Sequence, residues 1–506
     1  MTRPSIRLPE ALVLFVAAVP RVWAAIAEQG LFWPDEFYQS LEQAHRFAFG
    51  YGIVPWEFAE GARSWLFPGL IGILWKAMAL VGLSSAPALV IGAKLAMAAL
   101  SVFGVFLTMR LTLRLVERIT ENAELVRWSA ILAGLLAASF PALIFFGSKC
   151  MTETAAAPAL VGAMLLVTKT RSSEEAATAA TSVRETKRAL LRTFAAGAIL
   201  SLAIFLRYQT GLFAVAMFLL VLSELRWKEA LALAAGGVSV GILGGMLDAI
   251  TWGKPFFSFV YYVQFHAKGG ANAWGVAPFP YYFLNTLRSC GPSAYVFAVG
   301  LLLALPRFYR QVLVLAACVL VHSFVDHKEY RFITPFIPLA AALTAAGVAW
   351  LVSFVEPRAK LQLTSVPLWL GLFVSSALFY RTTHLTFRRL GHPGLAANLG
   401  DEGASVWHAA EGINRLLWKA GALPETCGIT VRFPWPSTGG FAYFHKDVPM
   451  VFDFDASARR GTNMLIARRE YNPPENWALI EESREFGLFR REGPCDPVEA
   501  PRAFPP

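Results

Sequence analysis

A dense run of charged side chains stands between two apolar stretches, in the segment from His327 to Pro338. It places an imidazole, the cations Lys328 and Arg331 and the carboxylate Glu329 close together. A charged side chain near hydrocarbon costs about 2.5 to 3.5 kcal/mol on insertion scales, so such a cluster usually faces water and an anionic partner. Arg can make two parallel bonds to a phosphate and Lys acts as a point charge. The cluster is therefore a candidate phosphate site, although a loop whose cations anchor at lipid headgroups fits the spacing as well.

A second group of chemically capable residues begins at Pro34-Asp35-Glu36, in a segment rich in aromatic side chains. Asp35 fits an N-cap for a helix over residues 36–47, with Glu36 as the acid of its first turn. The alternative is that a carboxylate at the end of a membrane span, in an aromatic pocket, serves as general base for a hydroxyl. On that alternative Asp35 and Glu36 are the candidate catalytic residues.

Other outward-facing segments supply candidate substrate-binding residues: Trp56, Glu57, Arg63, Arg207 and His266. The two arginines lie near the ends of apolar stretches and also fit the pattern of side chains that anchor at the membrane surface. The aromatic density of residues 252–283 suits either an interfacial belt or a platform for sugar rings or a prenyl chain. The sequence does not separate these two uses.

The composition is that of a polytopic membrane protein. Of 506 residues 56% are hydrophobic and 13% aromatic, and the mean hydropathy is +0.49. The net charge of +10 lies mostly between apolar segments and accompanies no nucleic-acid motif, so nucleic acid is not an expected partner. The five cysteines have no metal-ligand spacing, and we expect no metal and no cofactor. Only Cys427 and Cys495 are candidates to pair, if their segment lies in an oxidising compartment.

Twelve windows are apolar enough to span a membrane, each about 17 to 25 residues long. The basic clusters between them all fall on the cytoplasmic side only if one early window does not cross. We assign that role to residues 66–84, as an interfacial or re-entrant helix, because Pro68, Gly69, Trp75 and Lys76 interrupt its apolar run. The prediction is about eleven spans, with the N-terminus inside and the C-terminus outside. The predicted outer segments are 29–86, 148–153, 207–209, 251–288, 326–332 and the chain after 383.

The tail differs in composition from the rest of the chain, being richer in Pro, Gly and charge. Short β-like runs are predicted at Gly428–Arg432, Phe441–Phe444, Pro449–Phe454 and Asn463–Arg468. We therefore divide the chain into a transmembrane domain, residues 1–383, and a small α/β extracytoplasmic domain, residues 384–506.

Taken together these segments resemble glycosyltransferase family 22. Its members are lipid-linked-sugar-dependent mannosyltransferases of the GT-C fold, including enzymes of glycosylphosphatidylinositol (GPI) anchor and late N-glycan assembly. The resemblance covers most of the chain in the same order and extends into the tail. It rests on Pro34-Asp35-Glu36 with Gln39, Glu42 and His45, on Trp56-Glu57 with Arg63-Ser64, on Asp248 with Trp252-Gly253-Lys254, on His327 to Phe332 with Pro335 and Pro338, and on Pro436-Ser437-Thr438 and His445 to Phe452.

The resemblance implies an all-α polytopic GT-C fold with interfacial helices in the first outer loop. It implies an inverting transfer of a mannosyl residue from a polyprenyl-phosphate sugar to a hydroxyl of a glycan or glycolipid, in contact with membrane lipids. Asp35 matches the family's proposed catalytic base, and the run from His327 to Arg331 matches its signature near the donor phosphate. No obligatory metal is expected.

The third loop departs from the eukaryotic pattern, because Pro278 to Phe283 lacks the usual histidines. Abundant Ala and Arg, scarce Lys and the lack of an N-glycosylation sequon favour a bacterial member. We then expect an inner-membrane enzyme with a periplasmic active site, or an endoplasmic reticulum enzyme if the source is eukaryotic. Transfer of a different sugar, and a non-catalytic transporter or flippase of a lipid-linked saccharide, remain open alternatives.

Overall fold

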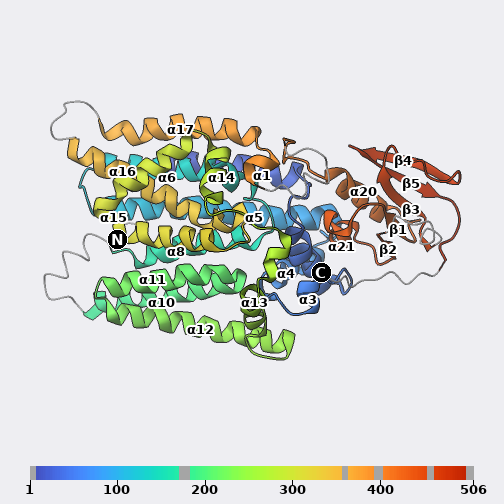
Figure 1. Cartoon of the computed structure of the whole chain (residues 1–506), viewed down its shortest axis with the longest axis horizontal. Coiled ribbons are helices and arrows are strands. Elements are labelled where there is room, and N and C mark those ends of the chain that lie inside the picture. The colour runs from blue at the N-terminus through green and yellow to red at the C-terminus, as the bar shows by residue number, and fades with distance from the viewer. Residues whose placement is uncertain (1–6, 170–182, 356–362, 392–402, 453–460, 497–506) are drawn as a thin grey trace.

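The computed structural model describes residues 7–169, 183–355, 363–391, 403–452 and 461–496. A long bundle of helices fills most of the molecule, and a small sheet domain lies beyond one end of the bundle (Figure 1). Most bundle helices run along the long axis, so each has one end toward the sheet domain and one end away from it (Figure 1).

The first half of the chain forms helices of very different lengths. In chain order they are α1 (Leu8–Ala27), the π-helical η1 (Glu36–Leu41), α2 (Glu42–Phe49), α3 (Trp56–Ala59), α4 (Leu66–Leu80), α5 (Ala86–Val116), α6 (Ala123–Ser139), α7 (Pro141–Phe145), α8 (Thr152–Val167), α10 (Val183–Leu206), the 3₁₀ turn η2 (Tyr208–Thr210), α11 (Gly211–Ser223) and α12 (Trp227–Trp252).

The second half completes the bundle and adds the helices of the tail. In order they are α13 (Phe257–Ala267), η3 (Gly270–Trp274), α14 (Tyr281–Cys290), α15 (Ser293–Phe324), η4 (Tyr330–Phe336), α16 (Ile337–Val355), η5 (Leu363–Ser365), α17 (Val366–Thr383), α18 (Phe387–Leu390), α20 (Glu411–Ala422), η6 (Trp435–Ser437) and α21 (Gly440–Phe444).

Seven helical stretches in the described part of the chain are long and apolar enough to cross a membrane, which agrees with the prediction of a polytopic membrane protein. Shorter apolar helices accompany them at Leu66–Leu80, Thr152–Val167 and Tyr208–Ser223. The total of eleven spans stays a prediction.

The element α15 joins two of the predicted windows into one helix of 32 residues, with a break at Phe308 (φ −121°, ψ 26°). A straight helix of that length would be about 48 Å long. Yet the segments flanking it touch: the Thr286 and Tyr330 hydroxyls are 3.0 Å apart, and Ala277 N–H donates to the Asp326 carbonyl at 2.9 Å. The chain therefore folds back at Phe308, as expected for two antiparallel spans.

Basic side chains from three predicted cytoplasmic clusters converge on one end of α8. Arg192 donates to the Leu166 carbonyl at 2.8 Å, Arg226 donates to the Val167 carbonyl at 3.0 Å, and Arg114 binds the same turn. Cations are favourable at a helix C-terminus, where carbonyl groups lack partners within the helix. These contacts place the three clusters at one common end of the bundle, which the positive-inside pattern predicts to be cytoplasmic.

The predicted non-crossing window corresponds to α4, which packs against α2 of the first outer loop. A Cβ atom on Gly72 would lie 2.6 Å from the Phe47 ring and 3.0 Å from the Ala44 carbonyl, so only glycine permits this approach. The helix is thus part of the same structure as the first loop. Its interfacial position in the membrane stays a prediction.

The tail contains a five-stranded sheet with strand order β2-β1-β3-β5-β4. The strands are β1 (Ile429–Val431), β2 (Met450–Val451), β3 (Met464–Arg468), β4 (Trp477–Ser483) and β5 (Phe486–Arg491). β1 pairs in parallel with β2 and β3, whereas β3, β5 and β4 pair antiparallel. Three predicted strands are present, but the predicted strand Phe441–Phe444 is wrong because those buried residues form α21. The hairpin β4–β5 was not predicted.

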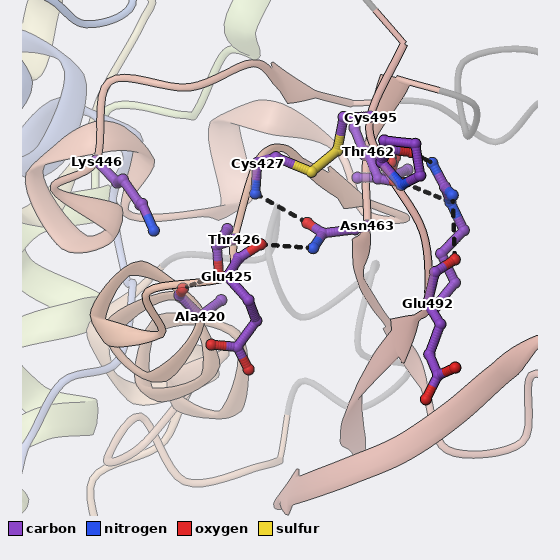
Figure 2. The surroundings of a disulfide bond; sticks show 12 residues. Ala420, Glu425, Thr426, Cys427, Lys446, Thr462, Asn463, Glu492 and Cys495 are labelled. Atoms are coloured by element: carbon purple, nitrogen blue, oxygen red, sulfur yellow. Dashed lines mark hydrogen bonds between the residues drawn. A yellow bond between two sulfur atoms is a disulfide. The ribbon is translucent and has the colours of Figure 1, made fainter.

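A disulfide between Cys427 and Cys495 closes the tail domain (Figure 2). Beside it, the Asn463 side chain accepts from Cys427 N–H at 3.0 Å and donates to the Glu425 carbonyl at 2.7 Å. The bond joins the start of the sheet to a segment 68 residues later. It agrees with the predicted pairing and with an oxidising location for the tail.

A buried carboxylate holds the tail against the first outer loop. Glu42 on α2 accepts the backbone N–H of Ile53 at 2.7 Å and that of Ala442 in α21 at 2.9 Å. Beside it the rings of His45 and His445 share a hydrogen bond of 2.8 Å. Burial raises the pKa of Glu42 to about 7, against the opposing effect of these amide hydrogen bonds.

We expect the Glu42 contribution to tail docking to be larger in mild acid than at neutral pH, whereas the neighbouring His45, whose pKa burial lowers to about 3, acts in the opposite direction. The pKa of Glu42 in the folded protein lies near 7 and above its ordinary value of 4.5, so the folded state holds a proton that the unfolded state releases. This contribution is fully present below pH 4.5 and is lost as pH rises through 7, a change of about 3 kcal/mol.

The measurement is the apparent melting temperature of purified protein between pH 5 and 8. The melting temperature of the wild type minus that of Glu42→Gln should fall as pH rises through 7, whereas the same difference for Glu60→Gln, an exposed change in the same loop, should not depend on pH. Identical pH profiles for Glu42→Gln and the wild type would contradict the assignment.

Candidate active site

The predicted outer segments surround a cavity of about 600 Å³ near the end of the bundle that faces the sheet domain. Ten of the residues predicted from the sequence line it: Asp35, Trp56, Glu57, Arg63, Arg207, His266, His327, Lys328, Glu329 and Arg331. Glu36 is not among the lining residues. Concave sites with a few convergent polar groups are the usual form of a ligand pocket.

Arg331 is the centre of the polar part of the cavity wall. Its guanidinium binds Asp35 Oδ2 at 2.5 Å, Glu329 Oε2 at 2.5 Å and Glu153 Oε1 at 3.3 Å. The Arg331 side chain is 5% exposed, whereas that of Asp35 is 24% exposed. Arg331 therefore fixes the orientation of Asp35 through Oδ2, while part of the Asp35 carboxylate stays open to the cavity.

Glu153 links a second cation to this centre. Its Oε1 lies 3.0 Å from Arg207 Nη1, and both side chains are buried. The Arg207 guanidinium also lies over the Phe332 ring, 4.8 Å from its centre. Glu153 thus holds Arg207 and Arg331 side by side, although like charges repel.

His327 and Lys328 form the next part of the wall. The two ring nitrogens of His327 lie 2.7 Å from the Gly275 carbonyl and 3.1 Å from Glu329 Oε1. Burial disfavours the imidazolium, but these two hydrogen bonds outweigh it and raise the pKa of His327 above its ordinary value. Lys328 donates to the Ala277 carbonyl at 2.6 Å. Both side chains are thus oriented by the loop before α14.

A second carboxylate faces the cavity from the first loop. Gln39 Nε2 donates to Glu57 Oε1 at 2.8 Å. Partial burial raises the pKa of Glu57; Arg63 opposes that rise and Asp35 adds to it. Arg63 lies over the Tyr262 ring, 5.9 Å from its centre. The cavity therefore presents two carboxylates of different surroundings close together.

The cations of the cavity differ in how they are compensated. Arg331 and Arg207 are held by carboxylates, as described above. Among the residues that the structure describes, Arg63 and Lys328 form no ion pair. Arg63 is partly exposed, and Lys328 is buried. A partly desolvated cation without a carboxylate partner is the better prepared to receive an anion.

Aromatic rings form another part of the cavity wall. Trp56 lies 5.1 Å from Phe265 and 5.7 Å from Trp274 between ring centres, with the two indoles nearly parallel. The His266 ring packs 4.0 Å from Tyr262, and burial lowers the pKa of His266. The wall gives the cavity a flat apolar face beside its charged one.

The position of Asp35 depends on its neighbour in the chain. Glu36 points away from the cavity, is fully buried, and lies 3.4 Å from Lys149 Nζ. It also accepts the backbone N–H of Cys150 at 3.1 Å, while Lys149 binds Glu28 at 3.0 Å. Glu36 begins the π-helical segment η1, a geometry frequent at functional sites. The structure thus separates the two candidate catalytic carboxylates by location.

The motif of Asp248 and Trp252 at the end of α12 contacts the segments that carry Arg63 and Arg207. Trp252 Nε1 donates to the Arg63 carbonyl at 3.1 Å. Asp248 accepts from the Ser258 hydroxyl at 2.6 Å, and this hydroxyl pairs with that of Tyr208, the residue after Arg207. The motif therefore supports the backbone at both arginines.

The tail also contributes to the cavity, which the sequence reasoning did not foresee. Trp435 and Pro436 line it, as does Gly391. The one signal was Pro436-Ser437-Thr438, noted only as part of the family resemblance. Tyr38 was missed as well, although it lies one helical turn after Asp35.

Within the described ranges, no group of three or more His, Cys, Asp or Glu side chains is arranged to hold a metal ion. The polar and aromatic lining of the cavity consists of carboxylates, cations and aromatic rings.

Comparison with known proteins identifies the family. Residues 12–393 match the Alg9-like mannosyltransferase family. The chain belongs to this family. The match covers the helical bundle from residue 12 onward and every cavity segment except the tail residues Trp435 and Pro436.

Curated relatives agree with this assignment. GPI mannosyltransferase 3 of Yarrowia lipolytica is 31% identical over 346 residues, which are 66% of this chain and 62% of that protein. GPI alpha-1,2-mannosyltransferase 3 of Bos taurus is 26% identical over 94% of this chain and 80% of that protein. This chain thus spans less than two thirds of the length of the Yarrowia relative.

Among solved structures, ArnT from Cupriavidus metallidurans bound to undecaprenyl phosphate is similar with a TM-score of 0.55 at 13% identity. The alignment covers 95% of this chain and 97% of that chain. The apo state of the same protein gives a TM-score of 0.53. The predicted GT-C fold of an integral membrane protein is confirmed.

Removing the buried cation behind the site should destabilise the protein. Lys149→Met would leave the buried carboxylates of Glu28 and Glu36 without their ion-pair partner, and breaking such a pair costs about 3 to 5 kcal/mol. We expect a clear fall in apparent melting temperature and in folded yield, whereas Lys187→Met, at an exposed position on α10, should change neither. Equal stability of the two variants would refute a stabilising role for this pair.

Proposed function

We propose that this protein is an integral-membrane inverting glycosyltransferase. It moves a mannosyl residue from a polyprenyl-phosphate sugar to a hydroxyl of a glycan or glycolipid. The observation that carries the proposal is the cavity itself, where Asp35 stands beside a cluster of cations in a chain of the Alg9-like mannosyltransferase family. The relatives named as GPI mannosyltransferases support mannose as the sugar and a glycolipid as the acceptor.

In this proposal Asp35 is the general base. Its carboxylate takes the proton of the acceptor hydroxyl as that oxygen forms a bond to the anomeric carbon of the donor sugar. The bond from that carbon to the phosphate oxygen breaks on the opposite face, and the polyprenyl phosphate leaves with the electron pair. Arg331 keeps Asp35 oriented, with one side of the carboxylate open to the cavity.

Arg63 and Lys328 are the proposed ligands of the donor phosphate, and protonated His327 adds positive charge beside them. Among the described residues neither Arg63 nor Lys328 forms an ion pair, although Glu57 and Asp326 lie within electrostatic range of them. The ring nitrogens of His327 are held by Gly275 and Glu329, and its raised pKa favours the cationic form. Positive charge near the phosphate stabilises the negative charge that grows on the leaving group. Undecaprenyl phosphate bound to ArnT supports this class of donor lipid, because the two chains share a fold.

The reaction takes place on the non-cytoplasmic side in this proposal. The Cys427–Cys495 disulfide and the gathering of the cavity segments at the end of the bundle away from the basic clusters support that side. We propose the bacterial inner membrane with a periplasmic site, and the two-domain division at residue 383.

Asp35→Asn tests the base. General bases typically contribute about 10²- to 10⁴-fold to rate, so kcat should fall by that factor. Donor affinity should stay the same or improve, because a negative charge is removed beside the phosphate ligands. The measurement is transfer from radiolabelled polyprenyl-phosphate mannose into a lipid extract of the source cells, with donor binding measured separately. Glu60→Gln, an exposed carboxylate of the same outer segment outside the cavity lining, is the matched control.

Two outcomes would argue against this function. Unchanged transfer by Asp35→Asn would eliminate it as the base. Donor binding without transfer by the wild-type protein would favour a transporter of lipid-linked saccharide.

Lys328→Ala and Arg63→Ala test the phosphate ligands. Each hydrogen bond to a charged group contributes about 1.5 to 3 kcal/mol, so each change should weaken donor binding about 10- to 100-fold. The comparison is with Lys268→Ala, an exposed cation of the third loop outside the cavity lining. Normal donor affinity in both variants would contradict phosphate binding by Arg63 and Lys328 and would favour a role as membrane anchors.

A further inference from the structure

The turn η6 carries the tail's contribution to the cavity. Trp435 and Pro436 line the same cavity as Asp35, Arg63 and Lys328. The tail reaches this position from the sheet domain, which lies beyond the end of the helical bundle (Figure 1). An aromatic residue of the tail domain therefore faces the proposed reacting groups.

Trp435 is held in place by several contacts. Its backbone carbonyl accepts hydrogen bonds from the Tyr38 hydroxyl at 2.6 Å and from the Thr438 hydroxyl at 3.0 Å. Its ring meets that of Tyr38 edge to face at 4.6 Å between centres. Pro434 and Pro436 flank it and restrict the backbone. A rigid aromatic ring at a cavity loses little entropy when a ligand packs on it.

Trp435 approaches the site from a direction that differs from that of the membrane. Large apolar side chains are exposed around the third loop and the end of α15, with Phe283 52% and Phe324 75% exposed. Lipid or the prenyl chain of a donor can cover such a surface. The sheet domain of the tail lies beyond the end of the helical bundle (Figure 1), and outside hydrocarbon we expect the polar part of a substrate.

We infer that Trp435, supported by Pro436, forms the acceptor subsite and takes a sugar ring of a glycan. This inference rests on the proposed function and adds the substrate that the tail recognises. The C–H face of a pyranose ring packs on the flat indole, as apolar ligand faces pack on aromatic pocket walls. The sugar hydroxyl at its edge then meets Asp35, which lies one helical turn before Tyr38, the residue that holds Trp435.

The distinction between the two substrates follows from this arrangement. Arg63 and Lys328 bind the donor phosphate, whereas Trp435 contacts only the acceptor. Changing Trp435 must therefore alter dependence on acceptor concentration and leave donor binding as it is. A residue that only stabilises the tail would alter neither constant selectively.

The experiment compares full-length Trp435→Ala, Trp435→Leu and Trp435→Phe with the wild-type protein. Transfer from radiolabelled polyprenyl-phosphate mannose is measured while the lipid extract of the source cells is titrated as acceptor. The acceptor KM should rise about tenfold in the Ala and Leu variants, the size of a typical aromatic contact in a binding site. Trp435→Phe, which keeps a flat ring, should recover most of this loss, and the donor Kd should stay unchanged in all three.

Two controls separate recognition from folding. Trp369→Ala removes an indole that is 67% exposed on α17, far from the cavity lining, and should behave like the wild type. Trp435→Leu keeps apolar volume, so it reports on the ring even if Trp435→Ala folds poorly. An intact Cys427–Cys495 disulfide and an unchanged melting temperature identify the folded variants.

An unchanged acceptor KM in the folded Leu variant would overturn the inference, and so would a donor Kd raised by the same factor. Equal losses in the Phe and Leu variants would also overturn it, because the flat ring would then not be what matters. If the wild-type protein transfers no label, the proposed function fails instead.

Discussion

The contact of Arg331 with three carboxylates is the interaction on which the site depends. Asp35, Glu153 and Glu329 come from three segments that are distant in the chain, and one guanidinium brings them together. A buried charge is costly unless paired, so no one of these loops can take its position alone. The same pairing that gathers the outer loops also gives Asp35 its orientation. Structure and chemistry are thus coupled through a single side chain.

A second buried network supports this centre. Lys149 binds Glu28 and Glu36, and Lys94 binds the Glu28 carbonyl at 2.9 Å. Packing between apolar helices in a membrane has little hydrophobic driving force and is tolerant of small shifts. Charged and hydrogen-bonded groups with fixed geometry restrict those shifts. The polar contacts at the outer end therefore determine how the bundle presents its loops.

The tail completes the cavity and does not form a separate unit of function. Glu42 and Tyr38 bind it from the first loop, next to Asp35 in the chain. The disulfide restricts the sheet domain that carries the turn at Trp435. On the proposed function, a lipid donor meets a polar acceptor, so one wall of the cavity should contact lipid and another should contact water. The helical bundle and the tail are the proposed sources of these two walls.

Local patterns in the sequence, together with the family resemblance, were enough for the membrane character, the order of the apolar segments, the small tail sheet and ten of the residues that line the cavity. Hydrophobic runs and charge bias report burial and sidedness directly, which is why Asp35 and the His327–Arg331 run were assigned to one face. Pairing was not predictable, because Asp35 and Arg331 are 296 residues apart and any outward carboxylate was a possible partner. Only the tertiary structure decided that Glu36 faces Lys149, that Phe441–Phe444 is helical and that Trp435 reaches the cavity, since each depends on contacts between distant segments.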